Sequence, residues 1–333
     1  MAEGVRRRRE ALGLSQMDLA AAAGLSRQLI GTVETGRHLP SVNAALALAR
    51  ALETTVENLF DTPIEQWEAP LEHPADEGAA LLAVRVGECL VYAPLSEHGA
   101  GSFWQRADGT FKGGRVQLFS GIEPEGFAVA GCDPALGLAA SFLPQRGPSR
   151  LVAIPATSAA ARRALDDGRL HAALIHGPTK AIGAPSEGMT RMRLARWRVG
   201  LAGRPGSRID LARLVGGRTK LAGLAAGAEA QKALDRALLD HGGSSKVTGP
   251  VASGHLESAR LVAYGVADLG VAMEPAARAY GLQFYPLEEH IVVLETHERW
   301  AEHPGARALT ALFASKTFRA HLGVVGGYDL PLS

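Results

Sequence analysis

Residues 24–36 read GLSRQLIGTVETG, a short helical stretch with a glycine at each end. Ser26 is placed to cap the helix, and apolar side chains recur at helical spacing behind it. Arg27 and Gln28 fall on its first turn. This segment therefore carries two long hydrogen-bonding side chains at the N-terminus of a short helix.

The preceding residues, 16–23, form a second helical pattern, joined to the first by a tight turn that contains glycine. Two helices in this relation are typical of a helix-turn-helix, whose second helix enters the DNA major groove by its N-terminal end. Arg27 suits guanine and Gln28 suits adenine, each by two parallel hydrogen bonds, and Thr32 lies one turn further along the same face. The pattern predicts a base-reading surface.

Residues 3–60 as a whole predict five short helices. Gln16, Arg37 and Asn43 are placed to contact phosphates. Acidic residues equal the arginines in number over residues 1–62, so we expect affinity to come from placement and dimeric binding more than from bulk charge. The predicted DNA-binding residues are Gln16, Ser26, Arg27, Gln28, Thr32, Arg37 and Asn43. The alternative is a helical bundle that binds another protein.

The composition sets wider bounds. The chain has 333 residues, enough for two or three domains, and its 35 Lys plus Arg nearly balance 34 Asp plus Glu, so net charge does not decide whether it binds nucleic acid. The two cysteines, Cys89 and Cys132, are far apart, which argues against a disulfide framework. No signal-peptide core follows the arginine run at residues 6–9, and no apolar run is long enough to cross a bilayer. A cytoplasmic protein without membrane association is expected.

The motifs of common enzymes are absent from the sequence: it has no GxSxG, no phosphate-binding Walker loop and no HExxH. We therefore expect no catalytic residues, no cofactor and no enzymatic activity. Cys132 stands next to a predicted helix start, where a lowered thiol pKa is conceivable, but burial as a small apolar side chain is the simpler interpretation.

The remainder of the chain divides by pattern. Residues 1–62 make the helical domain, residues 63–79 a proline-rich acidic linker, and residues 80–125 a β-rich arm that acts as an interface or a spacer. Residues 126–333 alternate strand-like and helical segments. This alternation predicts an α/β domain with a mostly parallel sheet, divided into two lobes, the second at about 198–284.

Ligands of such sheets lie beyond the carboxyl ends of the strands, near helix N-termini. The residues at these positions are Asp133, Thr157, Ser158, His176, Gly227, Ala228, His255, Glu257, Met273 and Glu274. Structural roles compete with ligand binding. Asp133 and Ser158 could only cap helices, and the helix dipole alone favours Glu257. His176 and His255 lack cysteine partners and short histidine spacing, so no metal site is predicted.

Two resemblances sharpen this interpretation. GLSRQLI, VETGRHLPS and LARALETTVENLF, within residues 4–62, resemble the XRE (phage-repressor-like) helix-turn-helix family. That resemblance implies a lambda-repressor-like all-α domain, double-stranded DNA as partner, and an ion pair between Arg9 and Glu34. Arg8 departs from the family, which usually has an apolar residue there.

The second resemblance covers about residues 126–330. AGCDPALGLAASFL, SAAARRALDDGRLHAALIHG, GVADLGVAMEPAARAYGL and FRAHLGVVGGYDL are similar to periplasmic-binding-protein-like domains of the type that includes molybdate-binding proteins. This similarity implies two lobes joined by crossing strands that close on a small ligand. It suggests molybdate, tungstate or a molybdenum-cofactor-related compound. The loop LAGLAAGAEAQKALD lacks the arginine often found there, and the acids near the expected cleft favour an organic ligand with donor groups.

The sequence thus predicts a multidomain, ligand-responsive transcriptional regulator that binds its operator as a dimer or higher homo-oligomer and senses a small molecule. Two alternatives remain. In one, the C-terminal domain only oligomerises. In the other, the chain is a binding or scaffold protein that does not contact DNA.

Overall fold

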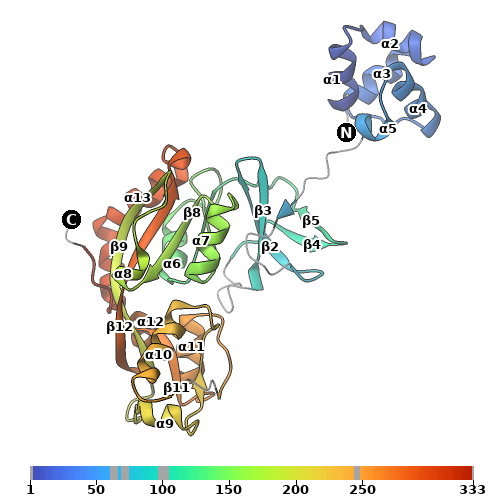
Figure 1. Cartoon of the computed structure of the whole chain (residues 1–333). Coiled ribbons are helices and arrows are strands. Elements are labelled where there is room, and N and C mark those ends of the chain that lie inside the picture. The colour runs from blue at the N-terminus through green and yellow to red at the C-terminus, as the bar shows by residue number, and fades with distance from the viewer. Residues whose placement is uncertain (1–2, 61–66, 69–74, 97–104, 244–247, 332–333) are drawn as a thin grey trace. The chain divides into compact units, whose positions relative to one another are not determined.

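The computed structural model of the chain describes residues 3–60, 67–68, 75–96, 105–243 and 248–331. The chain divides into two compact units, Met1–Gln66 and Trp67–Ser333. Each unit is described separately below (Figure 1). No helix within the described residues is both long and apolar enough to cross a membrane.

The N-terminal unit is helical throughout its described residues. Its helices are α1 (Glu3–Ala11), α2 (Gln16–Ala23), α3 (Arg27–Glu34), α4 (Val42–Ala51) and α5 (Val56–Phe60). Ser15 and Asp18 form a capping box at the start of α2, and Gly24 ends that helix with a left-handed φ of 65°. Ser26 then begins α3 by accepting a hydrogen bond from the backbone N–H of Leu29. These local signals fix the tight turn between α2 and α3.

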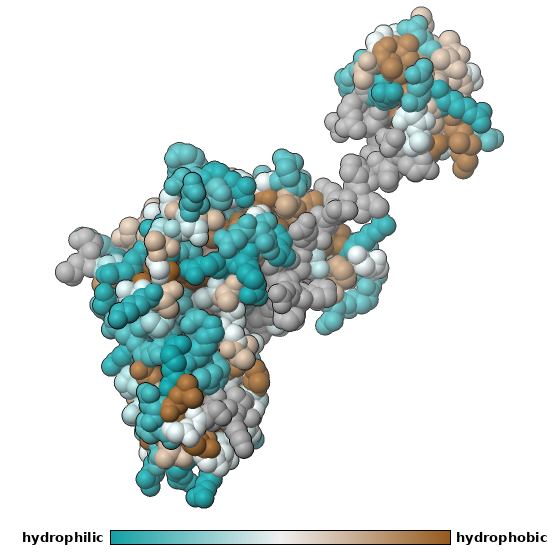
Figure 2. Space-filling view, viewed as in Figure 1, coloured by the Kyte–Doolittle hydropathy of each residue, from teal (hydrophilic) through white to brown (hydrophobic). Residues whose placement is uncertain are grey.

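The core of this unit gathers one apolar side chain or more from every helix. Its fully or nearly fully buried members are Val5, Leu19, Ala20, Ile30, Val33, Leu48, Ala49, Leu52 and Leu59. Because each helix is too short to be stable alone, this shared core holds the unit together. Large apolar side chains nevertheless reach solvent at Met17, Leu39, Val42 and Leu46, and Figure 2 shows apolar patches on this unit.

The second unit opens with a small sheet in the order β1-β3-β2-β4-β5. Its strands are β1 (Trp67–Glu68), β2 (Ala80–Val86), β3 (Cys89–Pro94), β4 (Gly109–Lys112) and β5 (Arg115–Leu118). Gly113 and Gly114 form the turn between β4 and β5, both at positive φ, at the position of the KGG turn signal. One face of β2 and β3 shares a core with β6 (Phe127–Gly131) and β7 (Leu151–Pro155). The segment predicted as an arm is thus packed onto the α/β domain.

The predicted linker, residues 63–79, differs from the structure in one respect. Trp67 and Glu68 form strand β1, which pairs in parallel with β3. Residues 63–66 and 69–74 lie outside the described part of the chain. The short strand escaped sequence reasoning because two residues give no periodicity, and its pairing depends on a partner more than twenty residues away.

The main sheet has the order β10-β11-β9-β12-β8-β6-β7. Its remaining strands are β8 (Ala172–Gly177), β9 (Met189–Gly203), β10 (Leu221–Ala222), β11 (Leu269–Met273) and β12 (Gln283–His297). The prediction of a mostly parallel sheet is wrong at the centre, where β9 and β12 run antiparallel to each other and to their outer neighbours. The reason is that these two strands are the connections that leave one lobe and return to it.

Lobe 1 is built on β6, β7 and β8, and lobe 2 on β10 and β11 (Figure 1). The helices of lobe 1 and its flank are α6 (Ala135–Phe142), α7 (Ser158–Asp166), α8 (Thr179–Ile182), α13 (Pro304–Ala314) and α14 (Lys316–Val325). Those of lobe 2 are α9 (Leu211–Val215), α10 (Glu229–Leu239), α11 (His255–Ala263) and α12 (Glu274–Ala279). A short 3-10 helix, Glu298–Trp300, follows β12. The predicted multidomain fold class is confirmed.

Two predicted strands of lobe 2 are shorter in the structure. The segment TKLAGLAAG contributes only Leu221–Ala222 to the sheet. Within KVTGPVA, Val251 forms an isolated bridge with Gly223, while Lys246 and Val247 lie outside the described residues. Glycine and proline interrupt both runs, so the ladder cannot extend.

Candidate functional site

The first candidate surface is the start of α3. Arg27 and Gln28 are exposed on its first turn, while the hydroxyl of Ser26 accepts from the backbone N–H of Leu29 at 3.2 Å. Ser26 is therefore occupied as a cap. The two residues that follow are free to reach outward from the helix N-terminus, which is the end that a recognition helix presents to base edges.

A buried charge cluster holds α1, α2 and α3 in place behind this surface. Arg9 Nε donates to Glu34 Oε1 at 2.6 Å, and Arg9 Nη1 donates to the carbonyl of Leu14 at 2.7 Å. Gln16 Nε2 donates to Glu34 Oε2 at 2.8 Å. Burial alone would raise the pKa of Glu34, but the hydrogen bonds from Arg9 and Gln16 outweigh it and hold that pKa below its ordinary value. Gln16 thus has one amide hydrogen committed to Glu34, which leaves its second for a phosphate.

The other predicted DNA-binding residues differ in their availability. The hydroxyl of Thr32 donates to the carbonyl of Leu29 at 3.0 Å, and its side chain is half-buried. Its hydroxyl hydrogen is therefore committed, which leaves the hydroxyl oxygen as an acceptor and the methyl group for a base contact, such as one with a thymine methyl. Arg37 and Asn43 are exposed. The surface around α3 therefore offers two base-reading side chains and exposed polar groups beside them.

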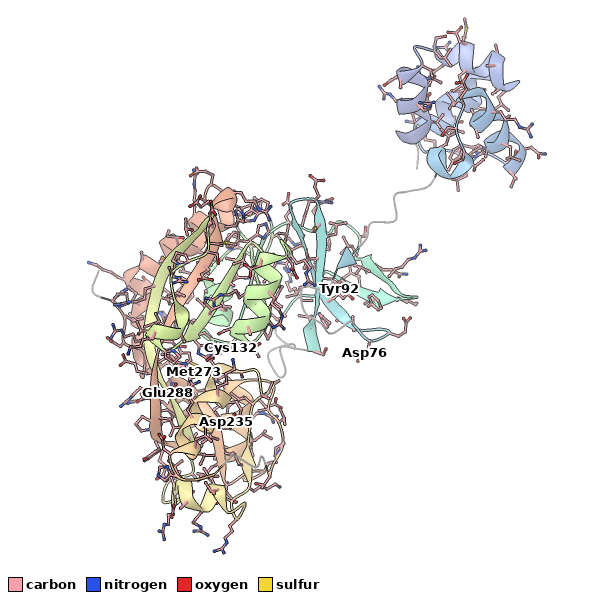
Figure 3. The ribbon with its side chains drawn as sticks, in the orientation of Figure 1. Asp76, Tyr92, Cys132, Asp235, Met273 and Glu288 are labelled. Carbon is pink, nitrogen blue, oxygen red and sulfur yellow. The ribbon has the colours of Figure 1, made fainter. Side chains whose placement is uncertain are left out.

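The second candidate site is a cleft of about 400 Å³ between the two lobes. Lobe 1 lines it with the residues that follow β6 and β7, and lobe 2 with the start of α11. The lining includes Cys132, Asp133, Ser253, His255, Glu257 and Arg260. Figure 3 labels Cys132, Met273 and Glu288 near the junction of the lobes. The position agrees with the rule that ligands lie beyond the carboxyl ends of strands.

Asp133 lies at the lobe 1 side of the cleft and is nearly fully buried. Its Oδ1 accepts from the Ala135 backbone N–H at 2.9 Å and from the Tyr328 hydroxyl at 2.6 Å. Its Oδ2 accepts from Trp197 Nε1 at 2.9 Å. Burial raises the pKa of Asp133, and these three hydrogen bonds oppose that rise. Because protein donors already take up the carboxylate, Asp133 mainly positions the β6–α6 loop.

A cluster of imidazoles and one thiol lies beside Asp133. The sulfur of Cys132 is 3.8 Å from His255 Nε2, and His176 Nδ1 is 2.9 Å from His290 Nδ1. His290 Nε2 is 3.3 Å from Glu288 Oε2. His176, His255 and His290 are buried, and Trp197 packs against all three rings.

Burial keeps the imidazoles of this cluster neutral at ordinary pH. It lowers the pKa of His255 to about 4, with a contribution from nearby His290. Burial, followed by His255 and His290, lowers the pKa of His176 well below its usual value. Burial and the carboxylate of Asp133 raise the pKa of the Cys132 thiol, which is opposite to the lowered pKa considered from its place at a helix start.

Among the described residues, Cys132, His176 and His255 form a group whose ligating atoms all lie within 4.8 Å of one another. Sequence spacing gave no sign of this group, because Cys132 and His255 are 123 positions apart. The expectation that the histidines lack a cysteine partner is therefore wrong for the folded chain, because Cys132 lies close to His176 and His255 although it is distant from them in sequence. Trp197, His290 and Tyr328 are the site residues that sequence reasoning did not select, and Cys132 was considered only as a thiol at a helix start.

The remaining predicted ligand residues of lobe 1 have structural contacts. Thr157 caps α7 by accepting from the Ala160 backbone N–H at 3.2 Å. The Ser158 hydroxyl accepts a hydrogen bond from the His176 backbone N–H at 3.0 Å and donates one to the His176 carbonyl oxygen at 3.2 Å. Neither residue lines the cleft. Their hydroxyls instead fix the start of α7 and the end of β8.

The predicted ligand residues of lobe 2 are divided. His255 and Glu257 line the cleft, and Glu257 Oε2 accepts from the Ser253 backbone N–H at 2.7 Å. Gly227, Ala228, Met273 and Glu274 do not line it. Met273 is fully buried in the core, and Ala228 precedes α10.

Glu274 is a structural acid. It accepts two hydrogen bonds from the guanidinium of Arg198, at 2.8 and 2.9 Å, and further ones from Arg278. Burial alone would raise the pKa of Glu274, but these two arginines hold it below its ordinary value. A carboxylate so fully paired has little capacity left for a ligand.

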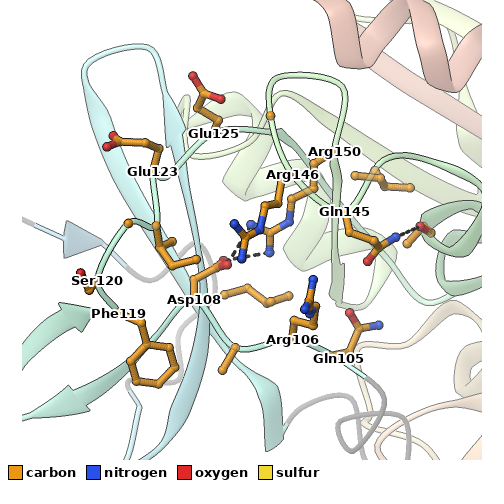
Figure 4. Close-up of a pocket in the computed structure, with 17 residues that line it drawn as sticks. Gln105, Arg106, Asp108, Phe119, Ser120, Glu123, Glu125, Gln145, Arg146 and Arg150 are labelled. Carbon is orange, nitrogen blue, oxygen red and sulfur yellow. Dashed lines mark hydrogen bonds and ion pairs between the residues drawn. The ribbon is translucent and has the colours of Figure 1, made fainter.

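A further cavity of about 400 Å³ lies between the small sheet and lobe 1 (Figure 4). Arg150 crosses it to pair with Asp108, and Arg106 and Arg146 lie near that pair, both exposed to solvent. The Arg150–Asp108 pair connects the small sheet to β7. This cavity therefore lies at the interface between the small sheet and lobe 1 of the second unit.

Residues 139–313, more than half of the chain, match the model of the PBP superfamily domain. The chain belongs to the PBP superfamily. Residues 1–60 match a helix-turn-helix domain model. The chain is thus a helix-turn-helix regulator with a PBP-like ligand-binding domain.

Individual relatives match one domain at a time. An uncharacterised helix-turn-helix-type transcriptional regulator of Methanothermobacter thermautotrophicus is 42% identical over 57 residues, which cover 17% of this chain and 83% of the relative. The restriction-modification controller protein C.AhdI of Aeromonas hydrophila is 41% identical, with 18% of this chain and 89% of that chain covered and a TM-score of 0.17. A substrate-binding protein of a phosphate transporter from Clostridium perfringens, with phosphate bound, is 10% identical and has a TM-score of 0.47. The match covers 62% of this chain and 100% of that chain.

Proposed function

We propose that this protein is a transcriptional regulator that binds an operator through α3 and changes its DNA affinity when a small effector occupies the cleft between the lobes. The observation that supports it most directly is the exposed Arg27–Gln28 pair at the capped N-terminus of the second helix of a helix-turn-helix. The chain joins this surface to a domain with a cleft of about 400 Å³. An effector shifts DNA affinity only by binding the two conformations unequally, and lobe closure would supply that difference.

The regulator acts in this proposal as a homodimer or a higher homo-oligomer in the cytoplasm. A single α3 offers only a few base contacts, so two copies on a palindromic site are needed for useful affinity. The exposed apolar side chains Leu39, Val42 and Leu46 support a surface for contact between copies. No catalytic role is part of the proposal.

The effector class can be narrowed by the charges at the cleft. Molybdate, tungstate or a molybdenum-cofactor-related compound would meet the N-terminus of α11, which favours anions. Glu257, however, already accepts the Ser253 N–H at this helix start, and the Asp133 carboxylate lies opposite. Two acidic residues in the cleft lining, Glu257 and the buried Asp133, weigh against a bare oxyanion and favour a cation or a ligand that carries donor groups.

The first experiment tests DNA recognition. The full-length protein selects its preferred duplex from a random DNA library, and affinity for that duplex is measured at fixed salt for Arg27→Ala/Gln28→Ala. Each good base contact contributes roughly 1–3 kcal/mol, so the double variant should lose most of its sequence discrimination. Arg50→Ala is the matched control, because it removes one positive charge from an exposed position of the same unit. Equal losses in both variants would contradict base reading by α3.

The second experiment tests effector binding. Thermal unfolding is followed with molybdate, tungstate, sulfate and phosphate, since a ligand at about a hundred times its dissociation constant adds roughly 2.7 kcal/mol. A raised midpoint with molybdate or tungstate alone would support the oxyanion. No shift with any of the four would set the simple oxyanion aside.

Two alternatives yield different results. If the PBP-like domain only oligomerises, removing every ligand leaves DNA affinity unchanged while self-association persists. If the helical unit binds a protein instead of DNA, the unsubstituted chain binds DNA only nonspecifically. The Arg27→Ala/Gln28→Ala variant then binds DNA with the same nonspecific affinity.

A further inference from the structure

The cluster at the base of the cleft joins the two lobes. Cys132 follows β6 and His176 lies near the end of β8, both in lobe 1, whereas His255 is the first residue of α11 in lobe 2. One ligating atom from each lies within 4.8 Å of the other two. Three donors from separate elements thus converge on one point beside a cleft that Cys132 and His255 line.

A chain of hydrogen bonds determines which nitrogen His176 presents to that point. Glu288 is held by Arg236 through two hydrogen bonds of 2.7 Å, so its carboxylate can only accept from His290 Nε2. A neutral His290 then has a bare Nδ1, which must accept from the Nδ1–H of His176 at 2.9 Å. His176 Nε2 is left with its lone pair free.

This arrangement is the one that metal-binding histidines use. A ligating imidazole almost always donates its other ring N–H to an outer partner, which fixes the tautomer and the ring orientation. Here a carboxylate–histidine relay from Glu288 and His290 does so for His176. Core packing alone requires no such relay.

His255 adds an independent observation. Its side chain is nearly fully buried, and its Nε2 faces the Cys132 sulfur at 3.8 Å. Its Nδ1 has no hydrogen-bond partner among the described residues, so no protein group fixes the tautomer and Nε2 can present its lone pair. In tetrahedral zinc sites, with Zn–S of about 2.3 Å and Zn–N of about 2.0–2.1 Å, ligand atoms lie about 3.6 Å apart. The Cys132–His255 separation is close to this value.

From this geometry we propose that Cys132, His176 and His255 bind a divalent transition-metal ion of the zinc type, with a fourth position open to the cleft. One thiolate and two imidazoles suit zinc, whereas magnesium and calcium require oxygen ligands. The thiol proton of Cys132 leaves to solvent as the Cys132 sulfur–metal bond forms.

The site ties His255 of lobe 2 to two ligands of lobe 1, so metal binding favours the closed domain. The idea that the metal is the effector of the regulator rests on the function proposed above. The idea that Cys132, His176 and His255 bind a metal does not depend on that function.

The binding test uses the full-length protein, reduced and freed of metal by a chelator. Co²⁺ is then added as a spectroscopic substitute for Zn²⁺. We expect one equivalent per chain to produce the visible absorption of four-coordinate Co²⁺ and a thiolate-to-cobalt charge-transfer band, both abolished by Zn²⁺. Folded protein that shows neither band would overturn the proposal.

Matched cysteine variants locate the site. Cys132→Ser should lose the charge-transfer band, and Cys89→Ser, which removes the other cysteine, should retain it. A band that persists in Cys132→Ser, or disappears in Cys89→Ser, would overturn the assignment. Should Cys132→Ser fail to fold by circular dichroism, Glu288→Gln tests the relay without touching a ligand. Its Zn²⁺ affinity, measured by competition with a chromophoric chelator, should fall by about 10–100-fold; an unchanged affinity would overturn the relay from Glu288 through His290 to His176.

A last measurement separates the metal from the proposed regulator. DNA affinity is compared with and without one equivalent of Zn²⁺, using the selected duplex. A change that is lost in Cys132→Ser supports the metal as effector. Unchanged affinity in protein with bound metal overturns the effector role alone, and sequence-independent binding in both states overturns the proposed regulator while the metal site stands.

Discussion

The guanidinium of Arg150 forms two parallel hydrogen bonds, of 3.0 and 2.8 Å, with the carboxylate of Asp108. Both side chains are largely buried, and Asp108 Oδ2 also accepts from the Ala83 backbone N–H at 2.8 Å. One carboxylate therefore connects β2, the β4 entry and the loop before β7. Together with the apolar core that β2 and β3 share with β6 and β7, this contact holds the small sheet on lobe 1 (Figure 4).

Asp108→Ala should lower the stability of the second unit by about 3 kcal/mol, because it leaves a buried guanidinium without its partner. Calorimetric unfolding of the full chain measures the change, and faster hydrogen exchange at Ala83 would place it at β2. Glu123→Ala is the control, since Glu123 lines the same cavity but is exposed. Similar losses in both variants would contradict the assignment.

The Glu34 carboxylate should make the helical unit sensitive to acid. Its pKa is held below the ordinary value, so its stabilising contribution is complete above the unfolded pKa of about 4.3 and is lost as pH falls through the folded pKa. Glu34→Gln should lower stability at neutral pH and flatten this dependence. Hydrogen exchange of residues 27–34, corrected for intrinsic rates, measures it in the full chain. Glu53→Gln, at an exposed position, should retain the unmodified profile; a flattened profile there would rule out Glu34 as the source.

The Tyr328 hydroxyl should stabilise the PBP-like domain through Asp133. Tyr328→Phe removes one donor to a buried carboxylate, and hydrogen bonds to charged groups contribute about 1.5–3 kcal/mol. We expect a loss of about 2 kcal/mol in thermal or denaturant unfolding. Tyr264→Phe alters an exposed ring and should be neutral. A neutral Tyr328→Phe would mean that the C-terminal segment does not hold Asp133 in solution.

Gly200 should not tolerate a side chain. A Cβ there would lie 2.0 Å from the carbonyl oxygen of Tyr285 on β12, so Gly200→Ala must move the backbone of β9 or β12. Forced overpacking costs about 1–3 kcal/mol, seen as a lowered unfolding midpoint. Gly137→Ala is the control, because Gly137 is helical with open space around it and alanine should be neutral or slightly stabilising there. Tolerance of Gly200→Ala would show that the strands are spaced more widely than in this structure.

The helical unit could be predicted from sequence because its signals are local. Ser15, Gly24 and Ser26 mark the helix ends within a few residues of the apolar positions that they organise. The alternation of strands and helices could also be predicted from the sequence. The direction of the central strands could not, because the sequences of β9 and β12 resemble those of any other extended segments until their pairing partners are known.

The cleft cluster could not be predicted for a related reason. Its members come from the ends of β6 and β8 and from the start of α11. Their spacing along the sequence does not correspond to any known metal-binding motif. His176 and His255 were selected by position alone. The significance of Cys132 and His290 depends on contacts that only the folded chain provides.

The pairing of β9 with β12 has a mechanical consequence. At the junction of the lobes the register shifts between Pro286 and Glu288, opposite Gly200 and Val199. An extra residue, Leu287, interrupts the ladder there, and Pro286 has no N–H to donate. Beside this interruption, at Glu289 and His290, the sheet narrows to β9 and β12, because β11 pairs with β9 at residues 199–203 and β8 pairs with β12 at residues 291–296. We expect the domain to flex at this narrow point. Flexing there would move one lobe relative to the other, and so open or shut the cleft between them.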